Sequence, residues 1–182
     1  MATAQAESTI PTGTWQSDPV HSHVGFAVKH VVGTFRGSFG RFEATLSDAS
    51  GQTQLAGRVP AESVEVKDES LQGHLLSPEF FDVEQTPEIA FQSTGIESQD
   101  GQVVIDGELT VKGITKPVVA RGEISGSAPG PDGNERISLD LETKVDRRDY
   151  GLNWQMELPN GGETLGYDVT LSVHLELIRE EA

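Results

Sequence analysis

Apolar and polar side chains alternate along most of this 182-residue chain. Alternation with a period of two residues predicts β-strands that bury one face in a core. The pattern covers residues 20–30, 103–111 and 137–145, and it returns near the C-terminus. The C-terminal series is the longest, and its predicted inward face is made of Tyr167, Val169, Leu171, Val173, Leu175 and Leu177.

The apolar parity changes once within residues 34–46. Phe35 and Phe39 share one parity, whereas Phe42 and Leu46 share the other, and glycines lie around the change. A change of parity beside glycines predicts a β-bulge or a sharp bend, which curls a sheet toward a barrel. A second bend is expected at the proline inside the apolar stretch 54–66.

Residues 68–82 interrupt the alternation. Leu71, Leu75, Phe80 and Phe81 follow one another at spacings typical of one apolar face of a helix. This segment is therefore predicted to be a short helical insertion that plugs or covers the sheet.

Two prolines delimit this insertion. Ser77-Pro78 predicts a fresh helix start, with Ser77 as N-cap and Pro78 at the first helical position. Pro87 excludes further helix, and residues 89–93 are predicted to resume as a strand.

The predicted elements amount to eight or nine strands joined by short connections, and no strand–helix–strand rhythm is present. The favoured architecture is an all-β, closed antiparallel eight-stranded barrel with the helical insertion, and a sandwich is the alternative. The sequence predicts a flexible tail over residues 1–12 and a single domain over residues 13–179.

The composition narrows the range of partners. The chain has 13 basic and 29 acidic residues, a net charge of −16 and a pI near 4.5, which disfavours nucleic acids and anionic membranes. Cysteine is absent, which excludes disulfides and thiolate chemistry. The N-terminal residues contain neither a signal peptide nor a transmembrane run, so a cytoplasmic protein without stable membrane insertion is expected.

Catalytic motifs for nucleotide, serine or zinc chemistry are not recognisable in the sequence. Two histidines on a predicted strand, His21 and His23, would point the same way and offer a metal site, although no carboxylate follows them closely. Residues 146–149 carry charges of both signs and are predicted to form cross-strand ion pairs. We therefore expect neither a catalytic residue nor a resident metal.

Several blocks together resemble the YceI-like family, in the correct order over residues 14–178. They are DPVHSHVGFAVKH with GTFRGSFGRF, then SVEV, HLLSPEFFDVEQTPEIAFQS, GELTVKGITKPV and VDRRDYGLNW. The resemblance implies a lipocalin-like barrel whose tunnel binds a polyisoprenoid or another long-chain amphiphile. It also implies that a homodimer is possible and that members are often periplasmic or secreted.

The sequence departs from the family pattern at three places. Leu71-Gln72 stands where the family has Arg-Asp, and Tyr150 stands where the family has Phe. The export signal of many members is not recognisable here.

The function predicted is therefore non-enzymatic binding of a long-chain isoprenoid or acyl lipid inside an apolar barrel, for transport, storage or sequestration. A metal-dependent enzyme using His21 and His23, and a structural or interaction domain with a filled core, remain alternatives. The predicted ligand-binding residues, with His30 and His74 at the polar end of the ligand, are Phe26, His30, Phe35, Phe39, Phe42, His74, Leu75, Phe80, Phe81, Phe91, Trp154 and Met156.

Overall fold

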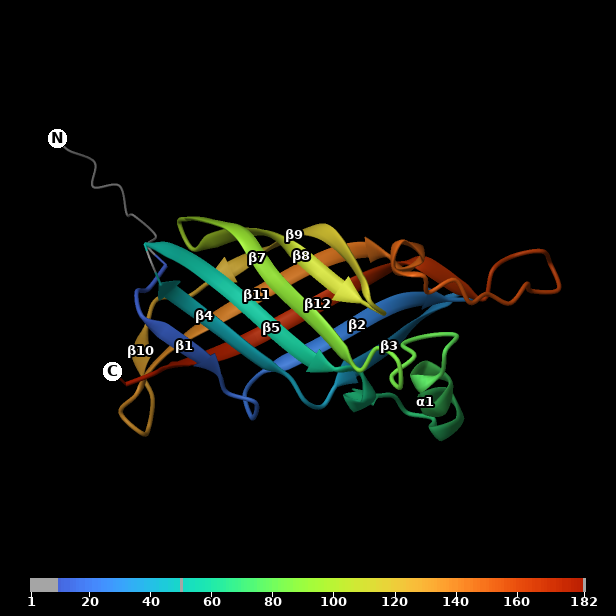
Figure 1. Ribbon diagram of the computed structural model, residues 1–182, viewed down its shortest axis with the longest axis horizontal. Helices are drawn as coiled ribbons and strands as arrows, with labels where there is room; N and C mark the ends of the chain where they lie inside the picture. Colours follow the sequence, from blue (N-terminus) through green and yellow to red (C-terminus); the bar gives the residue numbers. More distant parts are fainter. Residues whose placement is uncertain (1–9, 50, 182) are drawn as a thin grey trace.

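The computed structural model describes residues 10–49 and 51–181, and its main feature is a closed antiparallel eight-stranded barrel (Figure 1). The fold class predicted from the alternation is thus confirmed. The predicted flexible tail lies outside the described residues, except for residues 10–12. None of the described helices has the length and apolar character needed to cross a membrane.

The described residues form twelve strands of one sheet, and some positions around the barrel are occupied by two strands in succession. The bounds are β1 Thr14–Ser17, β2 His23–His30, β3 Gly33–Phe39, β4 Glu43–Ala49, β5 Gln52–Pro60, β6 Val64–Glu65, β7 Glu88–Gln99, β8 Gln102–Val111, β9 Ile114–Ile124, β10 Ala128–Pro129, β11 Glu135–Asp146 and β12 Leu165–Arg179.

The sheet closes on itself through β12. One edge of β12 pairs with β11, and the other edge pairs with β1 and β2. From there the wall continues through β4, β5, β7, β8 and β9 back to β11. Closure leaves few unpaired strand edges, which is how antiparallel barrels avoid edge-to-edge association.

The predicted change of parity coincides with an interruption of the strand structure between β3 and β4. Phe26 on β2 packs its ring over Gly37 on β3, where an added Cβ would lie only 2.3 Å from the ring. A glycine below an inward aromatic ring leaves space for that ring within a curved wall. The strand predicted over residues 20–30 begins later than expected, because β2 starts at His23.

The helical insertion is α1 (Glu69–Leu76), which Asp68 caps by accepting from the Leu71 N–H at 2.9 Å. Gln72 attaches the helix to β6: its amide donates to the Val64 carbonyl and accepts from the Val66 N–H at 3.2 Å. Gln72 thus anchors the insertion to the wall, at one of the two positions where the family pattern has Arg-Asp.

The predicted helix start at Ser77-Pro78 is wrong. Ser77 is the C-cap of α1, and its hydroxyl donates to the His74 carbonyl at 2.6 Å. Residues 78–81 form turns, in which the Phe81 N–H donates to the Leu75 carbonyl at 3.0 Å. Serine satisfies a carbonyl at the end of one helix here, instead of the first N–H groups of another.

Two apolar clusters occupy the two ends of the barrel. One is packed around the buried side chains of Trp15, Leu46 and Leu177, at the end where the described chain enters and leaves (Figure 1). The other gathers Val28, Phe39, Leu75, Phe80 and Tyr150 at the end that carries α1.

The ion pairs predicted across strands at residues 146–149 are wrong, because β11 ends at Asp146 and a 3₁₀ helix, η2 (Arg147–Tyr150), follows. Gly151 ends this turn in the left-handed region, at φ 73°. Arg148 pairs locally with Asp146 at 2.6 Å. Arg147 turns inward instead and is only 3% exposed.

The guanidinium of Arg147 holds this end of the barrel together. It donates to the Gly166 carbonyl at 2.8 Å, to the Leu152 carbonyl at 2.6 Å and to the Leu165 carbonyl at 3.2 Å. It also lies over the Tyr167 ring, 4.6 Å from the centroid. Burial lowers the pKa of this guanidinium. Among the described residues, no carboxylate forms an ion pair with it.

Replacing Arg147 with Ala should lower the free energy of unfolding by about 3 kcal/mol, because three buried carbonyls lose their donor. Arg148→Ala is the matched control, since the neighbouring guanidinium is exposed, pairs with Asp146 and also lies over the Tyr167 ring, but donates to none of the three buried carbonyls. Guanidinium chloride unfolding of both variants measures the difference. Equal midpoints for the two variants would contradict the anchoring role of Arg147.

Candidate cavity for an apolar ligand

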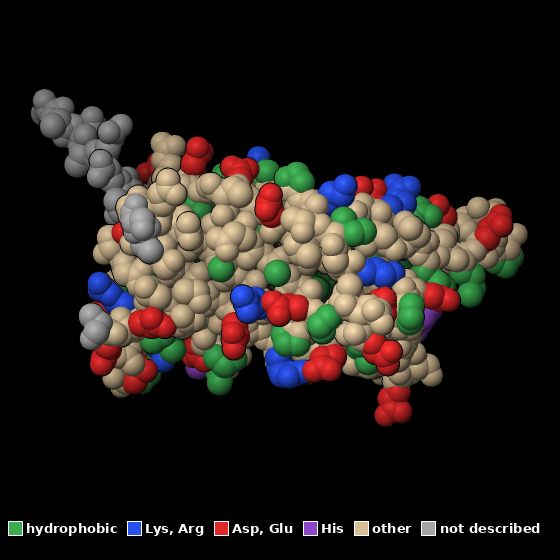
Figure 2. All heavy atoms as spheres, in the orientation of Figure 1, with side chains coloured by type: hydrophobic (Ala, Val, Ile, Leu, Met, Phe, Trp, Pro, Cys, Tyr) green, Lys and Arg blue, Asp and Glu red, His purple; other side chains and the backbone are tan. Residues whose placement is uncertain are grey.

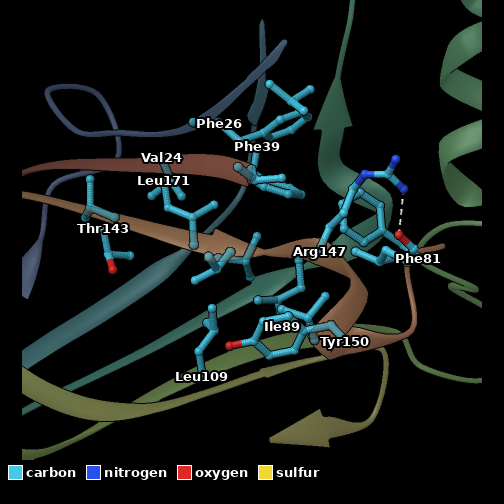
Figure 3. A pocket seen from close by; sticks show the side chains of 18 of the residues that line it. Val24, Phe26, Phe39, Phe81, Ile89, Leu109, Thr143, Arg147, Tyr150 and Leu171 are labelled. Atoms are coloured by element: carbon cyan, nitrogen blue, oxygen red, sulfur yellow. Dashed lines mark hydrogen bonds between the residues drawn. The ribbon is translucent and has the colours of Figure 1, made fainter. Parts of the chain in front are cut away.

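A cavity of about 760 Å³ lies inside the barrel and is lined almost wholly by apolar side chains (Figure 3). All eight positions around the barrel contribute to its wall. Trp15, Leu46 and Leu177 are not among the lining residues, so the packed cluster closes this end of the described barrel. Pockets for small ligands are of this size and this apolar character.

Eleven of the twelve residues predicted to bind the ligand lie on this wall. Met156 does not, and its side chain is 58% exposed. The eleven are Phe26, His30, Phe35, Phe39, Phe42, His74, Leu75, Phe80, Phe81, Phe91 and Trp154.

Aromatic rings form one side of the cavity. The Phe26 ring contacts those of Phe35 and Phe39, with centroids 6.0 and 5.7 Å apart. The Phe39 ring in turn meets Phe81 edge-on at 5.9 Å. Strands β2 and β3 and the turn after α1 are thereby joined by continuous ring contacts, which favour a fixed shape of the wall.

His74 stands in a second aromatic group beside the insertion. Its ring meets Phe80 at 4.9 Å and Trp154 at 5.4 Å, and its Nε2 lies 2.7 Å from Glu79 Oε2. The His74 ring is thus already partnered by two aromatic rings and a carboxylate. His30 is exposed at the last position of β2 and has no such partner among the described residues.

The cavity opens at the hairpin between β2 and β3. Val31 and Val32 belong to its lining, and yet the Val32 side chain is 97% exposed. Residues of α1 and of the loop before β12 lie on the same wall, namely Leu71 and Trp154. The apolar lining is therefore continuous with the molecular surface at this mouth.

Sequence reasoning left out many residues of the wall, most of them aliphatic. The strand alternation did predict that most of these side chains face inward, but it did not distinguish the wall of a ligand cavity from a packed core. They include Val24, Val28, Val59, Ile89, Leu109, Val111, Val118, Leu141, Val145, Leu152, Leu165, Val169, Leu171, Val173 and Leu175.

Two polar residues of η2 also reach the wall and were not predicted there. Arg147 is engaged with the three carbonyls described above. Tyr150 is 2% exposed, and burial raises the pKa of its phenol to about 12, with a further contribution from the charge of Asp149. Their inward placement follows from the tight turn of η2, for which Gly151 was the one sequence signal.

The two histidines considered for a metal have different partners. His21 lies before β2, with its Nδ1 at 2.8 Å from Asp18 Oδ2 and 3.3 Å from Glu176 Oε2. His23 stacks on His174, with centroids 6.4 Å apart. The ligand pair imagined on one strand face is not formed.

Asp18, His21 and Glu176 do bring three potential ligand atoms within 4.8 Å of one another. The same carboxylate oxygens, however, accept from Arg136 Nη1 at 2.9 Å and 2.8 Å. A metal ion would have to displace this guanidinium. The cluster is therefore built as a charge-assisted hydrogen-bond network on the outside of β12.

Hydrogen bonds from His21 and Arg136 lower the pKa of Asp18 from 3.8 to about 2, and Asp18 raises the pKa of His21 above 6.5. The Asp18 contribution to stability is complete above pH 3.8 and is lost as the pH falls toward 2. The His21 contribution is complete below pH 6.5 and is lost as the pH rises through its higher folded pKa.

Asp18→Asn should therefore lower the melting temperature most between about pH 4 and pH 6.5, with a smaller effect on both sides. Thermal melts of wild type and variant, from about pH 2 to about pH 9, measure this difference. Glu97→Gln, at an exposed position of β7, is the control. A difference independent of pH would contradict the network.

Comparisons with known proteins agree with this architecture. A sequence model of the YceI-like domain matches residues 15–177. The UPF0312 protein of Staphylococcus aureus strain N315 is 32% identical over 165 residues, which cover 87% of this chain and 94% of that protein.

Solved structures agree with the barrel. The YceI protein of Campylobacter jejuni is 26% identical with a TM-score of 0.70, over 84% of this chain and 90% of that one. BcnA of Burkholderia cenocepacia has a TM-score of 0.73 at 16% identity, over 90% and 99%. A polyisoprenoid binding domain from Saccharophagus degradans has a TM-score of 0.68 at 12% identity, over 93% and 100%.

Proposed function

Because this chain belongs to the YceI-like family, whose folds are binding barrels, we propose that it binds a long-chain isoprenoid or acyl lipid in its cavity and catalyses no reaction. The observation that carries the proposal is the cavity of about 760 Å³ with its apolar wall and its apolar mouth. The polyisoprenoid binding domain of Saccharophagus degradans, which has the same fold, supports this ligand class.

The physical driving force is the transfer of hydrocarbon from water to the barrel. Each buried methylene contributes about 0.8 kcal/mol, so a chain of ordinary lipid length gives ample affinity even after the cost of ordering it. A wall of fixed aromatic rings reduces that ordering cost on the protein side. Selectivity then comes from chain length, from branching and from the few polar groups of the wall.

A domain with a core filled by its own side chains is disfavoured by the cavity. A metal-dependent enzyme is disfavoured because Arg136 occupies the carboxylates beside His21, and because His23 has another partner. Thermal melts with Zn²⁺ test this alternative directly. A stabilisation of wild type that His21→Ala removes would support it.

Natively purified protein should release a single long-chain lipid species, near one per chain, into an organic extract analysed by mass spectrometry. A mock purification gives the background. Melting temperatures with a panel of prenyl and acyl lipids provide the second measurement, since a ligand that binds only the folded state raises the midpoint. A blank extract together with no shift for any lipid would sink the proposal.

Phe81→Glu should reduce lipid uptake at least tenfold, because a carboxylate on the wall must be desolvated when hydrocarbon fills the cavity. Val20→Glu is the matched control: the same charge is introduced at a side chain that is 80% exposed and outside the wall. Lipid titrations followed by tryptophan fluorescence compare the two, after circular dichroism has verified their folding. Equal uptake by both variants would contradict the assignment.

Leu171→Trp tests the same site by volume instead of charge. Leu171 on β12 points into the cavity, so an indole there should shorten the accommodated chain while preserving binding of shorter lipids (Figure 3). Melting temperatures measured with a graded series of chain lengths report this. An unchanged preference for chain length would place the ligand elsewhere.

A further inference from the structure

The hydroxyl of Tyr150 is a buried donor inside an apolar cavity. Tyr150 is the last residue of η2, its side chain is 2% exposed, and it belongs to the cavity wall. Figure 3 shows its hydroxyl directed into the cavity, on the side of Leu109. Within the described chain, this oxygen has no hydrogen-bond partner.

Such a group is uncommon in folded proteins, because a buried polar atom without a partner destabilises the native state. One other buried side-chain atom in the described residues shares this condition, Nε of Arg136, which lies outside the cavity. A phenylalanine ring would fill the same space without the cost. The hydroxyl therefore needs a partner that the surrounding protein does not provide.

Three other polar side chains of the wall are already engaged. Thr143 donates to the Val119 carbonyl at 2.8 Å, and Thr164 donates to the Met156 carbonyl at 2.7 Å. Arg147 is held by three carbonyls and by the Tyr167 ring. Of these donors, Tyr150 is the one whose hydrogen-bonding capacity is directed at the space that a ligand would fill.

We propose that the Tyr150 hydroxyl, at a position where the family pattern has Phe, donates a hydrogen bond to an uncharged acceptor oxygen of the bound lipid, such as a carbonyl oxygen. This inference rests on the proposed function and specifies its ligand. Tyr150 is then a specificity-determining residue, which distinguishes an oxygen-bearing chain from a pure hydrocarbon.

An uncharged acceptor fits the site better than a carboxylate or a phosphate. The surroundings of Tyr150 are apolar, and desolvating an ion costs far more than desolvating a carbonyl. Asp149, next to Tyr150, already contributes a negative charge that disfavours another anion. The phenol with its raised pKa stays protonated at neutral pH and remains a donor.

The decisive comparison uses two probes, geranylgeranylacetone, which is a prenyl ketone, and the hydrocarbon of the same skeleton without the oxygen. Tyr150→Phe should weaken binding of the ketone by about 2- to 12-fold, as expected for one net hydrogen bond, and leave the hydrocarbon unaffected. Tyr167→Phe is the matched control, since it removes the chain's other phenol, which lies outside the wall.

Infrared spectroscopy of the bound ketone, labelled with ¹³C at the carbonyl, gives an independent readout. In wild type and Tyr167→Phe, the carbonyl band should lie at lower wavenumber than in an aprotic solvent, and this shift should be absent in Tyr150→Phe. The unliganded Tyr150→Phe protein should also melt at a higher temperature than wild type, which shows that the variant folds.

The outcomes separate this inference from the function on which it rests. If both probes bind equally to wild type and Tyr150→Phe, with the same carbonyl band, the cavity is a lipid site and the role of Tyr150 is refuted. If neither probe binds to wild type, the proposed function and this inference fail together. If the variant loses affinity for the hydrocarbon as well, Tyr150 acts through the shape of the wall and not through its hydroxyl.

Discussion

The structure depends on the pairing of β12 along both of its edges. This strand joins β11 on one side and β1 and β2 on the other, and without it the wall would be an open sheet with two free edges. The same residues that complete the hydrogen bonding also face inward. Val169, Leu171 and Val173 line the cavity, and Leu177 is buried in the packed end. Closure of the barrel and the chemistry of its interior are thus specified by one alternating segment.

Where β12 begins, the buried guanidinium of Arg147 replaces part of the strand pairing. Its contacts with the carbonyls of Leu165 and Gly166 fix the first residues of the strand, near the bulge in the pairing of β12 with β2. The ring of Tyr167 also lies against this cation and against that of Arg148. An arginine suits this position because its planar group donates in several fixed directions and tolerates partial desolvation. The acidic residues are mostly left to the surface, where basic side chains lie among them (Figure 2).

Much of this structure follows from local patterns in the sequence. Period-two alternation predicted the strands and the change of parity predicted the bend before Phe42, because both depend only on which side of a sheet each residue faces. The helical insertion was predicted from its apolar spacing, and eleven of the twelve proposed site residues lie on the cavity wall. Phenylalanines that alternate within strands were a good guide to the interior.

The rest depends on contacts between distant segments. The sequence predicted Ser77 as the N-cap of a new helix, but its hydroxyl donates to the His74 carbonyl at the end of α1. Residues 146–149 look like a strand until the left-handed Gly151 allows a tight turn that sends Arg147 and Tyr150 inward. Whether a buried hydroxyl has a partner is a property of the folded interior, so Tyr150 could not be identified as an uncommitted donor from the pattern of residues alone.

The packed cluster around Trp15 and Leu177 has a consequence for how the proposed lipid would be exchanged. With that end of the described barrel closed, a ligand chain could not pass through the molecule from one side to the other. It would enter and leave past Val32, and the segment that enters first would be the last to leave. A ligand longer than the cavity would keep its trailing segment outside, within reach of an acceptor before the rest of the chain has left the barrel.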